Sequence, residues 1–118
     1  MDFSFQLYSA RNFPPIDDVL PRLAKLGYRQ VEGFGGLYAD AEALAASLKK
    51  HGLTMPTGHL GLAELKNIPA TLKIVETLGI RTLYCPAVPK EDRQQEESKW
   101  VELAETLATL GEAYRKEG

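Results

Sequence analysis

A short β-type run, then a turn, then an amphipathic helix recurs four times along this chain, and this repeat restricts the possible folds most strongly. Strands that alternate with helices are joined by right-handed crossovers, which gives a parallel sheet. We therefore predict an α/β fold of four consecutive βα units in a single domain, because no linker divides residues 1–118. The predicted strands are 3–9, 30–34, 54–60 and 82–86, and the predicted helices are 16–26, 40–51, one ending at 78 and one beginning near 98.

Capping residues support these helix boundaries. Asp40 is the predicted N-cap of the second helix, and His51 closes that helix, where a partly positive imidazole suits the helix dipole. Glycine follows each of the first three helices as a predicted stop. In the fourth helix, Ser98 is the expected N-cap. The residues expected to be buried from that helix are Val101, Leu103, Ala104, Leu107 and Leu110.

Composition excludes several classes of function. The formal net charge is -2 and the basic residues are scattered, so we expect no nucleic-acid partner. The single Cys85 excludes an internal disulfide and a zinc site built from cysteines. No apolar stretch is long enough for a membrane span, and the N-terminus does not have the pattern of a signal peptide. We therefore expect a soluble cytoplasmic protein.

Ligands of parallel α/β sheets collect at the carboxyl ends of the strands. This rule selects Tyr8, Ser9 and Arg11 after the first strand, and Glu32 with the "GFGG" turn after the second. It also selects His59 after the third strand. No nucleophile with a companion base is readable from the spacing, so no catalytic residue is assigned.

Glu32 stands in an apolar and glycine-rich strand, where a carboxylate is costly to bury unless it is paired. One interpretation is a polar group at a pocket mouth that binds sugar hydroxyls or holds a neighbouring side chain. In that case burial is expected to raise its pKa. The alternative is an ion pair with a loop arginine such as Arg11, or simple exposure at the end of the strand.

His59 lies between glycines in "TGHLGL", which let a ligand or backbone come close. It either donates to a sugar oxygen or moves a proton, or it is a structural histidine bonded to a backbone carbonyl. The segment "GFGG" does not lead directly into a helix as a dinucleotide-binding motif would, so a tight turn is the preferred interpretation. A phosphate-binding flavodoxin-like domain is therefore the weakest hypothesis.

Four segments carry a resemblance to a known family: "FQLYSAR", "LGYRQVEGFGG", "HGLTMPTGHLGLAEL" and "LGIRTLYCPA". The chain resembles the N-terminal half of the sugar phosphate isomerase/epimerase family, in the xylose isomerase-like TIM barrel superfamily. The resemblance implies half of a (β/α)8 barrel, and a chain that is a fragment of, or truncated from, a full barrel. Members of the family bind a divalent metal such as Mn²⁺, Mg²⁺, Co²⁺ or Zn²⁺ with residues of strands five to eight.

Because those strands lie outside this chain, no metal ligand is carried over, and we expect no metal to be bound by this chain alone. The resemblance implies that Glu32 and His59 contact or orient a sugar or polyol substrate, with Tyr8 and Gln6 lining the first-strand side. The complete protein would be a metal-dependent isomerase or epimerase, and this chain alone would be inactive.

A half barrel leaves its first and fourth strands open, with unpaired backbone groups. We therefore expect self-association through the exposed edge strands. The alternative function is a small non-catalytic α/β binding or assembly module, which would also be compatible with a dimer.

Overall fold

The protein is described from a computed structural model, which describes residues 3–13, 15–89, 93 and 96–118. Four strands form one parallel sheet in the order β1-β2-β3-β4, so β1 and β4 are its edges within these residues. Helices follow each strand, as the sequence predicted. The elements in chain order are β1 (Ser4–Gln6), η1 (Leu7–Ala10), α1 (Ile16–Lys25), β2 (Gln30–Phe34), η2 (Gly35–Asp40), α2 (Ala41–Lys50), β3 (Thr54–His59), α3 (Leu62–Lys66), α4 (Ile68–Leu78), β4 (Thr82–Tyr84) and α5 (Glu97–Lys116).

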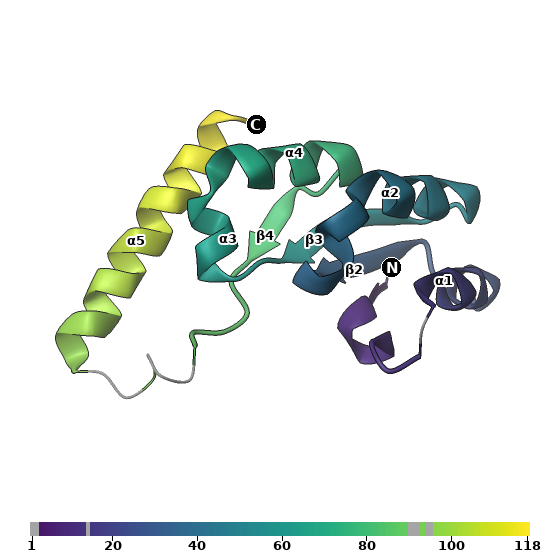
Figure 1. Ribbon diagram of the computed structural model, residues 1–118, viewed down its shortest axis with the longest axis horizontal. Coiled ribbons are helices and arrows are strands. Elements are labelled where there is room, and N and C mark those ends of the chain that lie inside the picture. The colour runs from purple at the N-terminus through teal and green to yellow at the C-terminus, as the bar shows by residue number, and fades with distance from the viewer. Residues whose placement is uncertain (1–2, 14, 90–92, 94–95) are drawn as a thin grey trace.

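The two faces of the sheet differ in their surroundings. Figure 1 shows α2 and α4 side by side along one face, in agreement with the contacts between these two helices. Side chains alternate across a strand, so in β2 Val31 and Gly33 face this helical layer and are buried, while Glu32 and Phe34 face the other side and are half-buried. We call this other side, which would line the interior of a closed barrel, the inner face.

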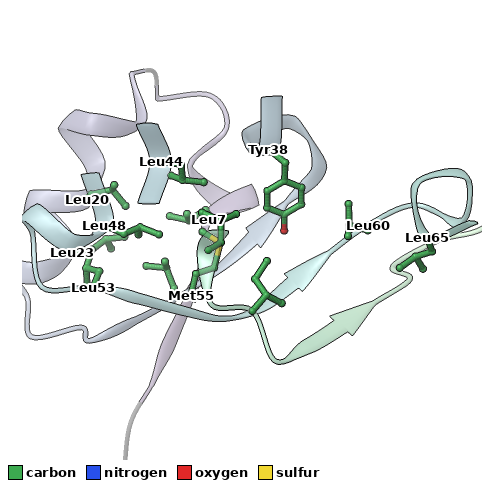
Figure 2. Packing of buried hydrophobic residues seen from close by; sticks show 13 residues of the cluster. Leu7, Leu20, Leu23, Tyr38, Leu44, Leu48, Leu53, Met55, Leu60 and Leu65 are labelled. Carbon is green, nitrogen blue, oxygen red and sulfur yellow. The ribbon is translucent and has the colours of Figure 1, made fainter. Parts of the chain in front are cut away.

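The hydrophobic core lies between the sheet and the helices. Figure 2 shows Leu7 and Met55 near its centre, with Leu20, Leu23, Leu44 and Leu48 converging from α1 and α2. Leu7, Leu20 and Val31 are completely buried. Full burial of such an aliphatic side chain stabilises a fold by about 1.5–3 kcal/mol.

Several predicted helix ends are confirmed. The Asp40 side chain accepts a hydrogen bond of 3.0 Å from the backbone N–H of Ala43, which caps α2. His51 is the C-cap residue of the same helix. Gly79 takes a left-handed conformation with a φ of 70° at the end of α4, where a side chain would be strained.

The first strand is shorter than predicted. β1 ends at Gln6, and residues 7–10, of which the sequence placed 7–9 in the strand, form the 3-10 turn η1 instead. This turn brings Leu7 and Ala10 into the core, which an extended edge strand would not do. The helix α3 between β3 and α4 was not predicted at all, because its five residues are too few to show helical periodicity.

The predictions for the last helix need correction. α5 begins at Glu97 with Glu96 as its N-cap residue, so Ser98 lies inside the helix. Of the residues predicted to be buried, Val101 and Ala104 are exposed, and Leu103, Leu107 and Leu110 are half-buried. Only the C-terminal part of α5 reaches the rest of the molecule, where Leu110 and Tyr114 pack against the core. The N-terminal part projects beyond the sheet (Figure 1).

Among the described residues, no helix is both long enough and apolar enough to span a membrane.

Candidate functional site

The register of the sheet places two rows of side chains across the inner face. In the first row Gln6 pairs with Glu32, Glu32 with Thr57, and Thr57 with Thr82. In the second row, two residues further along each strand, Phe34 pairs with His59 and His59 with Tyr84. The first row is polar and the second is aromatic.

Glu32 is the centre of a hydrogen-bonded cluster that joins three strands. The amide Nε2 of Gln6 donates to Glu32 Oε1 at 2.9 Å, and the hydroxyl of Thr57 donates to Glu32 Oε2 at 2.8 Å. His59 Nε2 lies 3.1 Å from Glu32 Oε1. The side chains of Glu32 and His59 are 18% and 22% exposed, so the pair is shielded and still reachable from solvent. We refer to Gln6, Glu32, Thr57 and His59 as the Glu32 cluster.

The electrostatics of the cluster correct one prediction. Burial acts to raise the pKa of Glu32, as the sequence analysis expected. The hydrogen bonds from Gln6 and Thr57, together with the electrostatic effect of His59, outweigh burial and hold the pKa of Glu32 below its ordinary value. The carboxylate is therefore ionised at neutral pH and acts as a hydrogen-bond acceptor.

Arg11 does not pair with Glu32. Its guanidinium carbon lies 4.1 Å from the centre of the Tyr8 ring, and its Nη1 donates to the Tyr8 carbonyl at 2.8 Å. The second interpretation of Glu32, an ion pair with Arg11, is therefore wrong. Tyr8 itself packs edge-on against Phe34, with ring centroids 5.3 Å apart, and so extends the aromatic row to the β1 side. At the other end His59 packs edge-on against Tyr84 at 5.8 Å.

Tyr38 supports the same two strands from the helical layer. Its ring is buried, and an added Cβ at Gly33 or Gly58 would lie 2.6 or 2.5 Å from its hydroxyl oxygen. The two glycines thus leave room for the Tyr38 ring, which Figure 2 shows among the buried hydrophobic side chains. Among the described residues the Tyr38 hydroxyl has no hydrogen-bond partner, although the His59 backbone is near enough to moderate its pKa. Burial, with a contribution from the Glu32 charge, raises the pKa of Tyr38.

The described residues do not bring together a set of metal ligands. No group of three His, Cys, Asp or Glu side chains comes together in the described part of the chain. The two donor-type side chains of the cluster, Glu32 and His59, have Oε1 and Nε2 directed at each other. Zinc sites, for comparison, draw three or four ligands from the protein.

Three of the four side chains predicted as substrate-binding, Gln6, Glu32 and His59, meet in one cluster, while Tyr8 lies in the adjoining aromatic row. Sequence reasoning missed Thr57 and Tyr38. Thr57 lies two residues before His59 and therefore on the same face of β3, a signal that strand alternation provides. No comparable signal exists for Tyr38, whose contact with β2 and β3 is long-range.

Comparison with known proteins shows which solved structures share the fold of this chain. No protein-family model and no curated protein matches the chain. Two solved structures match it closely in shape. An AP endonuclease, family 2, from Brucella melitensis has a TM-score of 0.79 at 20% identity, over 100% of this chain and 53% of that one. A sugar phosphate isomerase/epimerase from Parabacteroides distasonis ATCC 8503 has a TM-score of 0.76 at 23% identity, over 98% of this chain and 48% of that one.

The chain thus spans about half the length of the solved structures that it matches. The predicted four βα units and parallel sheet are confirmed. The chain has the fold of half of a TIM barrel.

Proposed function

We propose that this chain provides the substrate-binding wall of an isomerase or epimerase that acts on a sugar or polyol. The observation that carries the proposal is the Glu32 cluster, an ionised carboxylate held in place on the inner face at the carboxyl ends of the strands. Ligands of parallel barrels bind at this end. The likeness to a sugar phosphate isomerase/epimerase structure supports the same reaction class.

The unused hydrogen-bond acceptor positions of the cluster favour a ligand rich in hydroxyl groups. A carboxylate has about four acceptor positions, and the contacts from Gln6, His59 and Thr57 occupy three of them, which leaves Oε2 of Glu32 able to accept another hydrogen bond. Since Gln6 uses its amide N–H and Thr57 its hydroxyl proton, their remaining oxygen lone pairs are acceptors too. Neighbouring acceptors suit the several hydroxyl donors of a polyol.

In this assignment Glu32 and His59 bind and orient the substrate. The abstraction of a proton beside a carbonyl, which isomerisation requires, would be performed by residues outside this chain. Those residues would also hold the divalent metal expected of the complete protein.

The charge of the chain favours a sugar over DNA as the ligand. Another matching structure is an AP endonuclease, but this chain has a formal net charge of -2. Proteins that bind DNA neutralise several phosphates with lysine and arginine, and this electrostatic attraction supplies most of their non-specific affinity. Glu32 itself is an ionised carboxylate, which would repel a phosphate backbone.

The alternative is a non-catalytic binding or assembly module, for which the partly exposed inner face is the supporting observation. Mn²⁺ added to the complete protein separates the two. An assembly competent for metal-dependent catalysis binds Mn²⁺ and gains thermal stability, whereas a module without metal ligands does not respond.

Ligand-observed NMR tests the proposal with D-xylose, D-fructose and myo-inositol as probes. The unaltered chain is expected to bind at least one of them. Glu32→Gln should weaken that binding by about tenfold, because hydrogen bonds to a charged group contribute about 1.5–3 kcal/mol. Glu76→Gln is the matched control, since Glu76 is an exposed carboxylate on α4. If none of the probes binds, or if the two variants bind equally well, the proposed function is wrong.

A further inference from the structure

The inner face carries a row of aromatic side chains beside the polar ones. Phe34, His59 and Tyr84 are paired in register across β2, β3 and β4, two residues further toward the carboxyl ends than the polar row. Tyr8 continues this aromatic row on the β1 side. Binding sites for small molecules combine aromatic walls with a few polar groups that fix the orientation of the ligand. The aromatic row can therefore supply the apolar wall of the site whose polar part is the Glu32 cluster.

His59 connects the polar and the aromatic parts of this site. Its Nε2 lies 3.1 Å from Glu32 Oε1, and its ring packs edge-on against the Tyr84 ring, with centroids 5.8 Å apart and an interplanar angle of 83°. A ligand that contacts Glu32 and His59 together extends toward Tyr84 on the next strand. Because the two rings are nearly perpendicular, His59 covers at most one face of Tyr84.

The two exposed tyrosines of the row differ in what covers them. Tyr8 and Tyr84 are 48% and 46% exposed. The guanidinium carbon of Arg11 lies 4.1 Å from the centre of the Tyr8 ring, so a cation already occupies one face of Tyr8. In the described part of the chain no cation lies over the Tyr84 ring. Tyr84 thus offers the more open ring face to a ligand.

An open aromatic ring beside hydrogen-bonding groups suits a cyclic polyol. The hydroxyl groups of a pyranose or a cyclitol lie mainly around the rim of its ring, whereas the two faces of the ring are formed largely by C–H groups. The face of an aromatic ring is the negative part of its quadrupole and attracts the weakly positive hydrogens of these C–H groups. Stacking also removes apolar surface from water. A linear polyol carries the same kinds of groups but has no flat C–H face to present.

We propose that Tyr84 is a specificity-determining residue, which stacks on the C–H face of a cyclic polyol while the Glu32 cluster accepts hydrogen bonds from its hydroxyl groups. The inference rests on the proposed function, and it narrows the ligand from polyols in general to sugars or cyclitols bound in ring form. His59 contacts both Glu32 and Tyr84, so it sets the spacing between the two parts of the site. Stacking requires the aromatic ring of Tyr84 and does not require its hydroxyl.

Two polyols with equal numbers of carbon atoms and hydroxyl groups isolate the effect of ring closure. Ligand-observed NMR measures the dissociation constants of myo-inositol, which is cyclic, and of D-sorbitol, which is linear. Tyr84→Ala should weaken the binding of myo-inositol by about tenfold and that of sorbitol by less than about twofold. Tyr84→Phe should keep the preference of the unaltered chain for myo-inositol. Phe3→Ala is the matched control and should change neither constant, because Phe3 is an exposed aromatic residue immediately before β1, at the amino ends of the strands.

The outcomes separate this inference from the proposed function. Equal losses for both polyols in Tyr84→Ala, or loss of the preference in Tyr84→Phe, would overturn the inference. Binding that depends on Glu32 and not on Tyr84 would overturn it as well, and the proposed function would stand. If neither polyol binds the unaltered chain, the inference is wrong, and the proposed function is wrong with it only if D-xylose and D-fructose do not bind either. Circular dichroism confirms that each variant is folded, and Tyr84→Leu replaces Tyr84→Ala if the latter does not fold.

Saturation-transfer NMR tests the stacking geometry. In a chain deuterated everywhere except at its tyrosine rings, saturation of those rings should pass to the C–H groups on one face of myo-inositol. This transfer should disappear in Tyr84→Ala and persist in Tyr8→Ala. The reverse result would assign the stacking to Tyr8 and overturn the role of Tyr84.

Discussion

Glu32 Oε1 lies 3.1 Å from His59 Nε2, across two neighbouring strands of the same parallel sheet. Gln6 donates to the same oxygen from a third strand. The carboxylate of β2 is thus contacted by Gln6 from β1 and by Thr57 and His59 from β3. The cluster forms because the register of the sheet places Gln6, Glu32 and Thr57 side by side on neighbouring strands.

Stability should fall in acid through Glu32. Because its pKa in the folded chain is lower than the ordinary 4.5, the unfolded chain binds the proton more readily. The contribution is fully present above the ordinary pKa and is lost as the pH falls through the folded value. Urea unfolding between pH 6 and pH 3 should show this loss. Glu32→Gln should reduce the pH dependence and Glu76→Gln should leave it unchanged, and equal slopes for all three proteins would refute the assignment.

Tyr38→Phe should increase stability. The substitution removes a buried hydroxyl that has no hydrogen-bond partner among the described residues, and burying such a group costs about 1–3 kcal/mol. We expect a gain in the free energy of unfolding of about 1 kcal/mol, measured by denaturant titration. A loss of similar size would mean that the hydroxyl is hydrogen-bonded, with the His59 backbone as the nearest candidate.

Two glycine substitutions should act in opposite directions. A Cβ on Gly58 would lie 2.5 Å from the Tyr38 hydroxyl oxygen and 2.9 Å from Ile80 Cδ1, so Gly58→Ala should destabilise the fold by about 1–3 kcal/mol. A Cβ on Gly111 in α5 meets nothing within 4 Å, so Gly111→Ala should stabilise it by about 0.5–1 kcal/mol. Denaturant unfolding measures both.

Combining Gly58→Ala with Tyr38→Phe tests the contact itself. Part of the cost should disappear, because the closest atom is then absent. Strict additivity of the two changes would show that Tyr38 does not limit the space at Gly58.

Tyr114→Phe should loosen the attachment of α5. The Tyr114 hydroxyl donates a 2.6 Å hydrogen bond to the Leu65 carbonyl, and this contact joins α5 to α3. Loss of the bond should cost about 1 kcal/mol and speed amide hydrogen exchange in α5. The exchange of β2 and β3 should stay nearly constant. If exchange in α5 does not change, the helix is held by Leu110 and its apolar neighbours alone.

The sequence was sufficient for the repeated part of the fold. Helical periodicity and glycine stops located α2 and α4, and the prediction of 30–34 for β2 matched the structure because Val31 and its neighbours alternate as a strand must. The rule that ligands bind at the carboxyl ends of parallel strands predicted that Glu32 and His59 belong to the same site. Periodicity and glycine stops are local features of the sequence, and the strand-end rule follows from the order of strands and helices.

The rest depended on contacts that no local pattern carries. The direction of the pKa shift at Glu32 follows from Gln6 and Thr57, which lie 26 and 25 residues away in the chain. The exposure of Val101 could not be predicted from the sequence. The apolar spacing of α5 is typical of a helix with one buried face, and this spacing does not say which part of the chain packs against that face. Partners distant in sequence decided both outcomes.

The most direct test of the central claim is the position at which a sugar binds. Carbon-13 NMR can follow the side-chain carboxyl of Glu32 and the ring of His59 while D-xylose, D-fructose or myo-inositol is titrated into the chain. The account predicts that the Glu32 carboxyl and His59 ring signals move together with saturation, while the Glu76 carboxyl on α4 stays in place. Binding that moves signals of the helical layer and leaves Glu32 and His59 unchanged would contradict the account.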